Sequence, residues 1–165
     1  MRVAVVVPSY QARESLGGVI DDLLATLPDV ATEDLIVVDD GSSDGTADVA
    51  RERGVRLAMH TRNRGKGAAL RTGLAEAGQL GYHAALTVDA DGQHPASAAR
   101  AVLEASSDPN DLVLGIRNLA SAGAPRANQM SNRFSNMVLS GFAGKRIADT
   151  QCGLRRYPIA KTLAL

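Results

Sequence analysis

The sequence is poor in aromatic residues and contains no tryptophan. Aromatic residues make up 3% of its 165 positions, so a hydrophobic core has to be built from Val, Leu, Ile and Ala. The shares of hydrophobic residues, 45%, and of charged residues, 22%, are ordinary for a soluble globular protein. A chain of this length can form one domain with a sizeable buried core.

The sequence also lacks a second cysteine and an excess of either charge. Because Cys152 is the only cysteine, no intramolecular disulfide can form, and a reducing compartment is expected. With no obvious His partner nearby, Cys152 is interpreted as a packing residue rather than a nucleophile. The formal net charge is zero, which disfavours nucleic-acid binding through bulk positive charge. We therefore expect no nucleic-acid partner.

Long apolar segments are missing as well. No apolar run approaches the ~20 residues that a membrane-spanning helix needs. The first residues lack the basic start, the apolar stretch and the small-residue cleavage site of a signal peptide. These absences predict a cytoplasmic protein.

Short apolar segments alternate with helical patterns along the chain. Strands are predicted where β-branched and other apolar residues cluster, at residues 2–8, 35–38, 55–59, 84–88 and 112–116. Helices are predicted from apolar residues at helical spacing and from capping residues, at about residues 15–27, 44–53, 68–77, 95–105 and 129–142. Residues 147–157 are expected to be extended, with a short helical piece after them. This order predicts an α/β fold with a mostly parallel central sheet flanked by helices.

The fourth predicted strand leads into the carboxylates of Asp89 and Asp91. If the strand continues through Asp91, both carboxylates point to the same side of it, with Gln93 and His94 just beyond. Oxygen ligands of this kind suit a hard divalent cation, Mg²⁺ or Mn²⁺, which usually completes its shell with phosphate oxygens and water. Neighbouring carboxylates repel each other unless a cation or basic group offsets them, so a purely structural role explains them poorly. His94 is either a further ligand or substrate contact, or only a turn residue.

Charged residues also follow the other predicted strands. Asp39 and Asp40 follow the second strand, Lys66 follows the third and Arg117 follows the fifth. Ligands of open α/β sheets bind at the carboxyl ends of the strands, so we expect these side chains to face one cleft. Simpler interpretations stay open: the two aspartates can belong to a turn that caps a helix, and Lys66 can be solvated in its loop.

Two familiar loop motifs can be set aside. Residues 40–51 imitate the start of a calcium-binding loop, but Arg51 stands where a bidentate Glu is needed. Residues 65–67 resemble a fragment of a phosphate-binding loop, but the earlier glycine and the Ser or Thr after the lysine are absent.

Several segments, in order, resemble one enzyme family. Residues 5–10 (VVVPSY), 37–46 (VVDDGSSDGT), 63–67 (NRGKG) and 88–95 (VDADGQHP) resemble the inverting glycosyltransferases of family two. Residues 149–157 (DTQCGLRRY) are similar to the branch that holds dolichyl-phosphate mannosyltransferases and bacterial polyprenyl-phosphate glycosyltransferases. The resemblance implies the nucleotide-sugar-binding GT-A fold. It implies one catalytic domain over residues 1–165 that is shorter at its C-terminus than these relatives.

The resemblance also implies roles for individual residues. Contacts with the nucleotide-sugar donor are implied for Pro8, Tyr10, Glu14, Asp39, Lys66, Asp89 and Ala90. Metal ligation is implied for Asp89, Asp91 and Gln93, catalytic roles for Asp91 and Asp149, and contacts with the acceptor phosphate for Arg117 and Arg133.

The implied reaction is metal-dependent, inverting transfer of a sugar from a UDP- or GDP-linked donor to a polyprenyl phosphate or another lipid-linked acceptor. Peripheral contact with the inner face of the membrane and a part in building the cell envelope would follow from such an acceptor. Two alternatives stay open: transfer to a hydroxyl of a glycan or protein, and a catalytically silent nucleotide-binding module. Processive polymer synthesis is disfavoured because Gln151 does not begin a QxxRW sequence.

Overall fold

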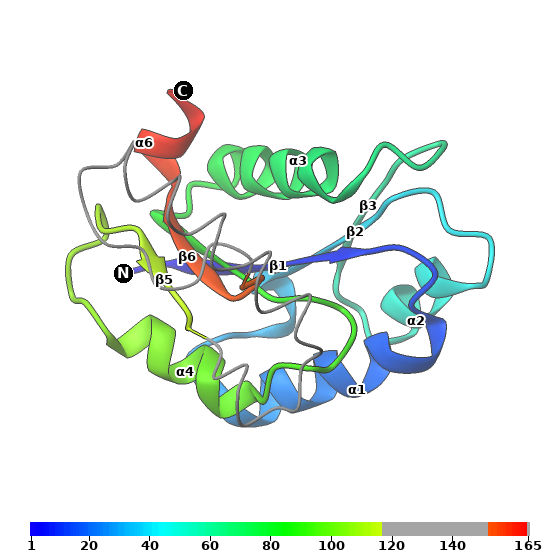
Figure 1. Ribbon diagram of the computed structural model, residues 1–165, viewed down its shortest axis with the longest axis horizontal. Helices are drawn as coiled ribbons and strands as arrows, with labels where there is room; N and C mark the ends of the chain where they lie inside the picture. The colour runs from blue at the N-terminus through cyan, green and yellow to red at the C-terminus, as the bar shows by residue number, and fades with distance from the viewer. Residues whose placement is uncertain (117–151, 165) are drawn as a thin grey trace, which may run out of the picture. The chain divides into compact units, whose positions relative to one another are not determined.

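The computed structural model describes residues 1–116 and 152–164 (Figure 1). The chain divides into two compact units, one made of residues 1–113 and 154–165 and the other of residues 114–153. The description below concerns the first unit. Within the described residues, no helix is long and apolar enough to cross a membrane.

One sheet forms the centre of the fold. Its strands lie in the order β3-β2-β1-β4-β6-β5, and their bounds are Val3–Ser9 (β1), Leu35–Asp39 (β2), Arg56–Met59 (β3), Ala84–Thr87 (β4), Val113–Leu114 (β5) and Arg155–Pro158 (β6). β1 pairs in parallel with both β2 and β4, and β2 pairs in parallel with β3. β6 is antiparallel to β4. The prediction of a mostly parallel sheet in an α/β fold is confirmed.

Helices cover both faces of this sheet. Their bounds are Arg13–Thr26 (α1), Thr46–Glu52 (α2), Lys66–Gln79 (α3), Ala96–Glu104 (α4) and Ile159–Leu163 (α6), with a short 3-10 turn at Thr32–Asp34 (η1). Figure 1 shows α3 and α6 on one face and α1 and α4 on the other. α1 packs against both α2 and α4, and α3 packs against α6.

The central strands are apolar on both faces because both faces are covered. Val6 and Val38 belong to the core beneath α3, and Val5 and Val7, which alternate with Val6 along β1, are fully buried as well. Gly73 allows α3 to lie close to the sheet, since a Cβ added there would stand 2.3 Å from Val6 Cγ1. The core is therefore built mainly from Val, Leu, Ile and Ala, as the scarcity of aromatics required.

The ends of three predicted elements differ from the structure. β4 ends at Thr87, and after one more ladder bond from Val88 N–H to Val6 O the chain turns. The strand therefore does not continue through Asp91, and strand alternation does not place the two carboxylates on one side. A positive φ of 70° at Gly92 accompanies the turn. Two helices begin two residues earlier than predicted, α1 at Arg13 and α3 at Lys66.

Capping interactions explain where α2 begins and ends. The N-cap of α2 is Gly45, and Asp44 just before it accepts a hydrogen bond from Thr46 N–H at Oδ1, at 2.9 Å. Gly54 has a φ of 66°, the left-handed conformation that glycine supplies after a helix. Gly54 acts as the sequence predicts, whereas the N-cap of α2 is Gly45 and not Ser43 or Asp44.

Candidate functional site

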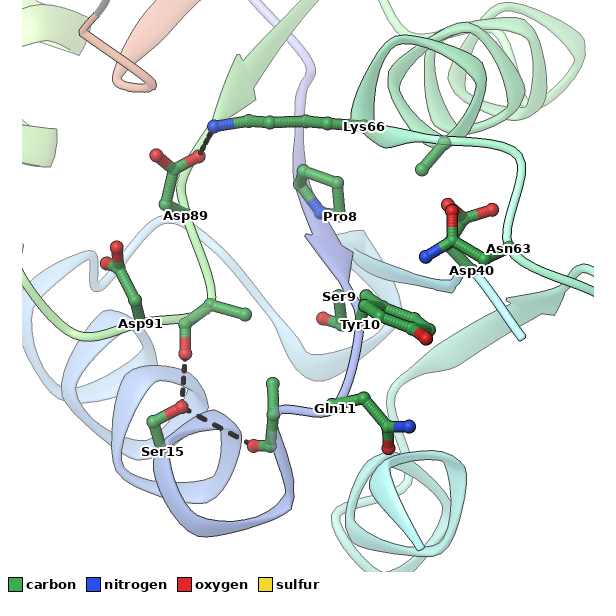
Figure 2. Close-up of a pocket in the computed structure, with 13 residues that line it drawn as sticks. Pro8, Ser9, Tyr10, Gln11, Ser15, Asp40, Asn63, Lys66, Asp89 and Asp91 are labelled. Atoms are coloured by element: carbon green, nitrogen blue, oxygen red, sulfur yellow. Dashed lines mark hydrogen bonds and ion pairs between the residues drawn. The ribbon is translucent and has the colours of Figure 1, made fainter. Parts of the chain in front are cut away.

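A cavity of about 370 Å³ opens at the carboxyl ends of the parallel strands. Its lining comes from the segments that follow β1, β2, β3 and β4 and from the first turns of α1 and α3: Pro8, Ser9, Tyr10, Gln11, Ala12, Ser15, Asp40, Asn63, Lys66, Ala69, Asp89, Ala90 and Asp91. Figure 2 shows Asp89 and Asp91 on one side of this cavity and Asp40 and Asn63 on the other.

The carboxylates of Asp89 and Asp91 share the cavity because of a turn, not because of strand alternation. Asp89 Oδ1 forms an ion pair with Lys66 Nζ at 2.6 Å, and the side chain of Lys66 is half exposed. Asp91 is exposed, and its Oδ1 accepts a hydrogen bond from the backbone N–H of Gln93 at 3.0 Å. The side chain of Lys66 thus supplies the positive charge that two neighbouring carboxylates need.

The segment after β1 forms the floor of the cavity and is held by the segment after β2. Tyr10 is 50% exposed, so its ring face is available to a ligand. Gln11 has a φ of 50°, which is uncommon for a residue with a side chain. Its backbone N–H donates to Ser42 Oγ at 2.9 Å, and its side-chain amide donates to Ser43 Oγ at 3.1 Å. These bonds offset the strained backbone and fix Tyr10 beside the cavity.

Ser15 connects α1 to the segment that carries the two carboxylates. Its hydroxyl donates to the carbonyl oxygen of Ala90 at 2.6 Å (Figure 2). Since Ala90 stands between Asp89 and Asp91, this bond holds both carboxylates relative to α1.

Asp40 is the most extensively bonded carboxylate of the site. Its Oδ1 lies 2.6 Å from Nδ1 of His60 and accepts the backbone N–H of Arg64, while Oδ2 accepts the backbone N–H of Gly65 at 2.7 Å. Burial by itself would raise the pKa of Asp40, but the hydrogen bonds from His60, Arg64 and Gly65 outweigh burial, and the pKa lies below its ordinary value. Asp40 is therefore ionised at neutral pH.

Asp39 lies behind the cavity lining, at the end of β2. It is fully buried, and its Oδ1 accepts the backbone N–H of Ser42 at 3.1 Å. Its Oδ2 is buried and has no hydrogen-bond partner among the described residues. A buried carboxylate oxygen without a donor is costly, so it marks a place where a ligand donor would be favourable.

The structure brings together most of the predicted donor-side residues. Pro8, Tyr10, Lys66, Asp89, Ala90 and Asp91 line one cavity. Glu14 lines a different cavity beside Arg13 and Asp44, and Gln93 contributes its backbone N–H next to the site. The predicted acceptor-side residues Arg117, Arg133 and Asp149 lie outside the described residues.

The sequence did not indicate a role for four uncharged polar lining residues: Ser9, Gln11, Ser15 and Asn63. It also did not separate Asp40 from its neighbour Asp39. Ser15 could have been found from its place in the first turn after the β1 segment, where helix residues face the carboxyl edge of the sheet. No sequence pattern indicates Gln11, because its hydrogen bonds to Ser42 and Ser43 depend on its unusual backbone conformation.

The carboxylates of Asp89 and Asp91 fit a hard divalent cation whose remaining coordination positions are filled by a bound ligand. Within residues 1–116 and 152–164, no group of three or more His, Cys, Asp or Glu side chains could hold a metal ion. Asp89 and Asp91 offer carboxylate oxygens to the same cavity (Figure 2). Mg²⁺ and Mn²⁺ are commonly held by one or two carboxylates together with phosphates and water, so two carboxylates suffice.

Comparison with known proteins gives one consistent family. The family model described as Glycosyl transferase family 2 matches residues 4–161. An undecaprenyl-phosphate mannosyltransferase of Micrococcus luteus is 30% identical over 165 residues, covering 95% of this chain and 66% of that protein. The chain spans about half to two thirds of the length of the curated relatives it matches.

Solved structures agree with this match. Mannosyl-3-phosphoglycerate synthase from Rubrobacter xylanophilus superposes with a TM-score of 0.75 at 24% identity, covering 97% of this chain and 54% of that one, and shows the same fold. The mannosyltransferase PcManGT from Pyrobaculum calidifontis, in complex with GDP-Man and Mn²⁺, is 29% identical with a TM-score of 0.54, covering 66% of this chain and 33% of that one. The fold is the GT-A fold of nucleotide-sugar transferases, and the chain belongs to glycosyl transferase family 2.

Proposed function

We propose that residues 1–165 form the catalytic domain of a metal-dependent, inverting glycosyltransferase. It transfers a sugar from a nucleotide-sugar donor to a polyprenyl phosphate or another lipid-linked acceptor. The observation that carries this proposal is the convergence of Asp89, Asp91 and Lys66, from two different strand ends, on one cavity. Two carboxylates and an ammonium group are complementary to a cation and to the diphosphate that the cation binds.

The diphosphate of the donor binds at the side of the cavity formed by the β4 segment. Asp89 and Asp91 hold a Mg²⁺ or Mn²⁺ ion, with Gln93 beside them. A cation held there supplies Lewis-acid stabilisation of the departing nucleoside diphosphate. Lys66 contributes a point charge to the phosphates. The Pyrobaculum calidifontis relative, which was solved with GDP-Man and Mn²⁺, supports this assignment.

The nucleoside binds along the β1 and β2 segments. Pro8 and the half-exposed ring of Tyr10 give it an apolar surface. Asp39 accepts hydrogen bonds from the base or ribose, which would give its buried Oδ2 the donor that it lacks. Glu14 remains a further donor-side candidate, although it faces a different cavity.

The acceptor side is proposed from the relatives and from the sequence. The Micrococcus luteus relative is named for undecaprenyl phosphate. An acceptor phosphate is already an anion and needs orientation more than deprotonation, the task proposed for Arg117 and Arg133. A hydroxyl acceptor would instead need a general base, for which Asp149 is the candidate. A lipid-linked acceptor also requires peripheral contact with a membrane surface.

Calorimetry with UDP and with GDP, with and without Mn²⁺, tests the donor half. We expect binding of at least one nucleotide that depends on Mn²⁺. Asp91→Asn should abolish turnover and Mn²⁺-dependent binding while leaving the circular dichroism spectrum unchanged. Asp48→Asn, which removes an exposed carboxylate of α2 that does not line the cavity, serves as the matched control and should behave as the wild type. Nucleotide affinity that does not respond to Mn²⁺ would contradict the proposal.

Turnover assays then identify the acceptor. With the preferred nucleotide sugar, polyprenyl phosphate is expected to accept the sugar, whereas an oligosaccharide offering only hydroxyl groups is not. Transfer to the hydroxyl acceptor alone would replace the lipid-phosphate assignment. Nucleotide binding without transfer to either acceptor would indicate a binding module.

A further inference from the structure

A chain of buried and partly buried hydrogen bonds runs from the edge of the cavity into α3. The side chains of Asp40 and His60 are 4% and 6% exposed, and Asp40 Oδ1 lies 2.6 Å from His60 Nδ1. The second ring nitrogen, Nε2, lies 2.9 Å from the hydroxyl of Thr72 in the second turn of α3. Thr72 is not part of the cavity lining. A residue outside the cavity is thus connected to a carboxylate at its edge.

The same carboxylate fixes the segment that follows β3. Asp40 accepts the backbone N–H groups of Arg64 at 3.0 Å and Gly65 at 2.7 Å. This segment also lies backbone to backbone against the β2 segment, because a Cβ added at Gly41 would stand 2.5 Å from the carbonyl carbon of Arg62. The position of residues 61–65 therefore depends on the orientation of the Asp40 carboxylate.

The imidazole of His60 determines that orientation. An ionised Asp40 requires a hydrogen on Nδ1, and a neutral ring then accepts the hydroxyl hydrogen of Thr72 at Nε2. Because the ring is held at both nitrogens, the carboxylate it contacts is held as well. The backbone N–H of His60 donates to Asp39 O at 2.9 Å, which fixes the other end of the residue.

The segment held in this way carries two lining residues of the cavity. Asn63 lies within it, and Lys66 follows it as the first residue of α3. We propose that His60 and Thr72 are positioning residues. With Asp40 they hold residues 61–65 in place and thereby set the affinity of the cavity for a nucleoside diphosphate. The identity of the ligand rests on the proposed function; the hold on residues 61–65 does not.

The test uses Thr72→Val, which keeps the shape of the side chain and removes the hydroxyl, and Thr72→Ser, which keeps the hydroxyl. Loss of one hydrogen bond corresponds to a factor of about three to ten. In Thr72→Val we expect amide hydrogen exchange at Arg64 and Gly65 to accelerate by about that factor, and the Kd for Mn²⁺–UDP or Mn²⁺–GDP to rise similarly. The affinity for Mn²⁺ alone should not fall, because Asp89 and Asp91 lie on another segment. Thr72→Ser should restore both properties.

Thr162→Val is the matched control, since Thr162 on α6 donates its hydroxyl to Pro158 O at the end of β6, and neither residue lines the cavity. Unchanged exchange at Arg64 and Gly65 in Thr72→Val would overturn the proposal, as would faster exchange with unchanged nucleotide affinity. Acceleration of all core amides, or the same effect in Thr162→Val, would show a general loss of stability and also overturn it. If the wild type binds no nucleotide, the proposed function fails, and exchange at the two amides alone decides whether the segment is held as described.

Discussion

Lys66 and Asp89 neutralise each other inside the cavity, although each has a different proposed partner in the ligand-bound protein. The cation is proposed to bind Asp89, and the diphosphate is proposed to bind Lys66. An incoming cation therefore competes with Lys66 for Asp89 Oδ1, which now lies 2.6 Å from the ammonium nitrogen. A nucleotide sugar that binds together with its cation would replace the Lys66–Asp89 ion pair with two others, one between the cation and Asp89 and one between the diphosphate and Lys66.

This exchange predicts opposite effects of Lys66→Met on two affinities. Mn²⁺ alone should bind about two- to fivefold more tightly, because a half-exposed ion pair of about 0.5–1 kcal/mol no longer competes. Mn²⁺ with UDP or GDP should bind more weakly, because the phosphates lose a positive charge. Calorimetry measures both. Arg64→Gln removes a nearby exposed cation that has no ion pair with Asp89, and an equal gain in Mn²⁺ affinity there would contradict the competition.

At the residue scale, the sequence identifies which carboxylates matter but not how they are arranged. Strand alternation would place Asp89 and Asp91 on one side only if β4 continued through Asp91, yet they share the cavity because the chain turns after Val88. Asp39 and Asp40 are neighbours of identical chemistry, and only the end of β2 decides that Asp40 lines the cavity. Which side chains enter the cavity depends on the residue at which each strand ends, and a sequence pattern predicts the ends of strands poorly.

At the scale of elements, α3 lies very close to β1 at Gly73. This contact predicts that Gly73→Ala destabilises the protein by about 1–3 kcal/mol, although alanine favours a helix, because Val6 Cγ1 would stand 2.3 Å from the new Cβ. Urea unfolding measures the change.

Gly18→Ala in α1 is the matched control for this prediction. A Cβ at Gly18 would meet nothing within 4 Å. This variant should therefore gain about 0.5–1 kcal/mol from helix propensity. A stability gain in both variants would show that α3 can move away from β1 at little cost.

The elements themselves follow closely from local pattern. β1 and β2 are continuous β-branched runs, and α1 and α3 have apolar residues at helical spacing, so their positions were predicted to within a few residues. β6 was not foreseen as a sheet strand, because Arg155–Pro158 has no strand-like composition and its pairing with β4 is distant in sequence. The fully buried Arg156 holds this strand in the sheet, because its guanidinium donates to the carbonyls of Leu103, Ser106 and Asp108.

At the scale of the whole molecule, Asp40 links stability to pH. Its pKa in the folded protein lies below the ordinary value of 3.8, so its contacts stabilise the fold above that value. This contribution is lost as the pH falls from about 4 towards the folded pKa. Asp40→Asn should be less stable by about 1–3 kcal/mol at pH 7 and should lose less stability on acidification. Urea unfolding between pH 7 and pH 3 measures both curves, and parallel curves would contradict the assignment.

β5 and β6 are neighbours in the sheet, although the chain leaves β5 at Leu114 and returns at Arg155. Residues 115–154 are therefore a single connection, called the cassette below, between two neighbouring strands of the sheet. Doubling the length of such a connection costs only about 0.6 kcal/mol of closure entropy, so its length and sequence can vary while the strand register persists. All three residues proposed for the acceptor, Arg117, Arg133 and Asp149, fall inside this cassette, whereas every proposed donor residue falls outside it. If the proposed acceptor roles hold, exchanging this connection between relatives should change the acceptor and leave nucleotide binding unchanged.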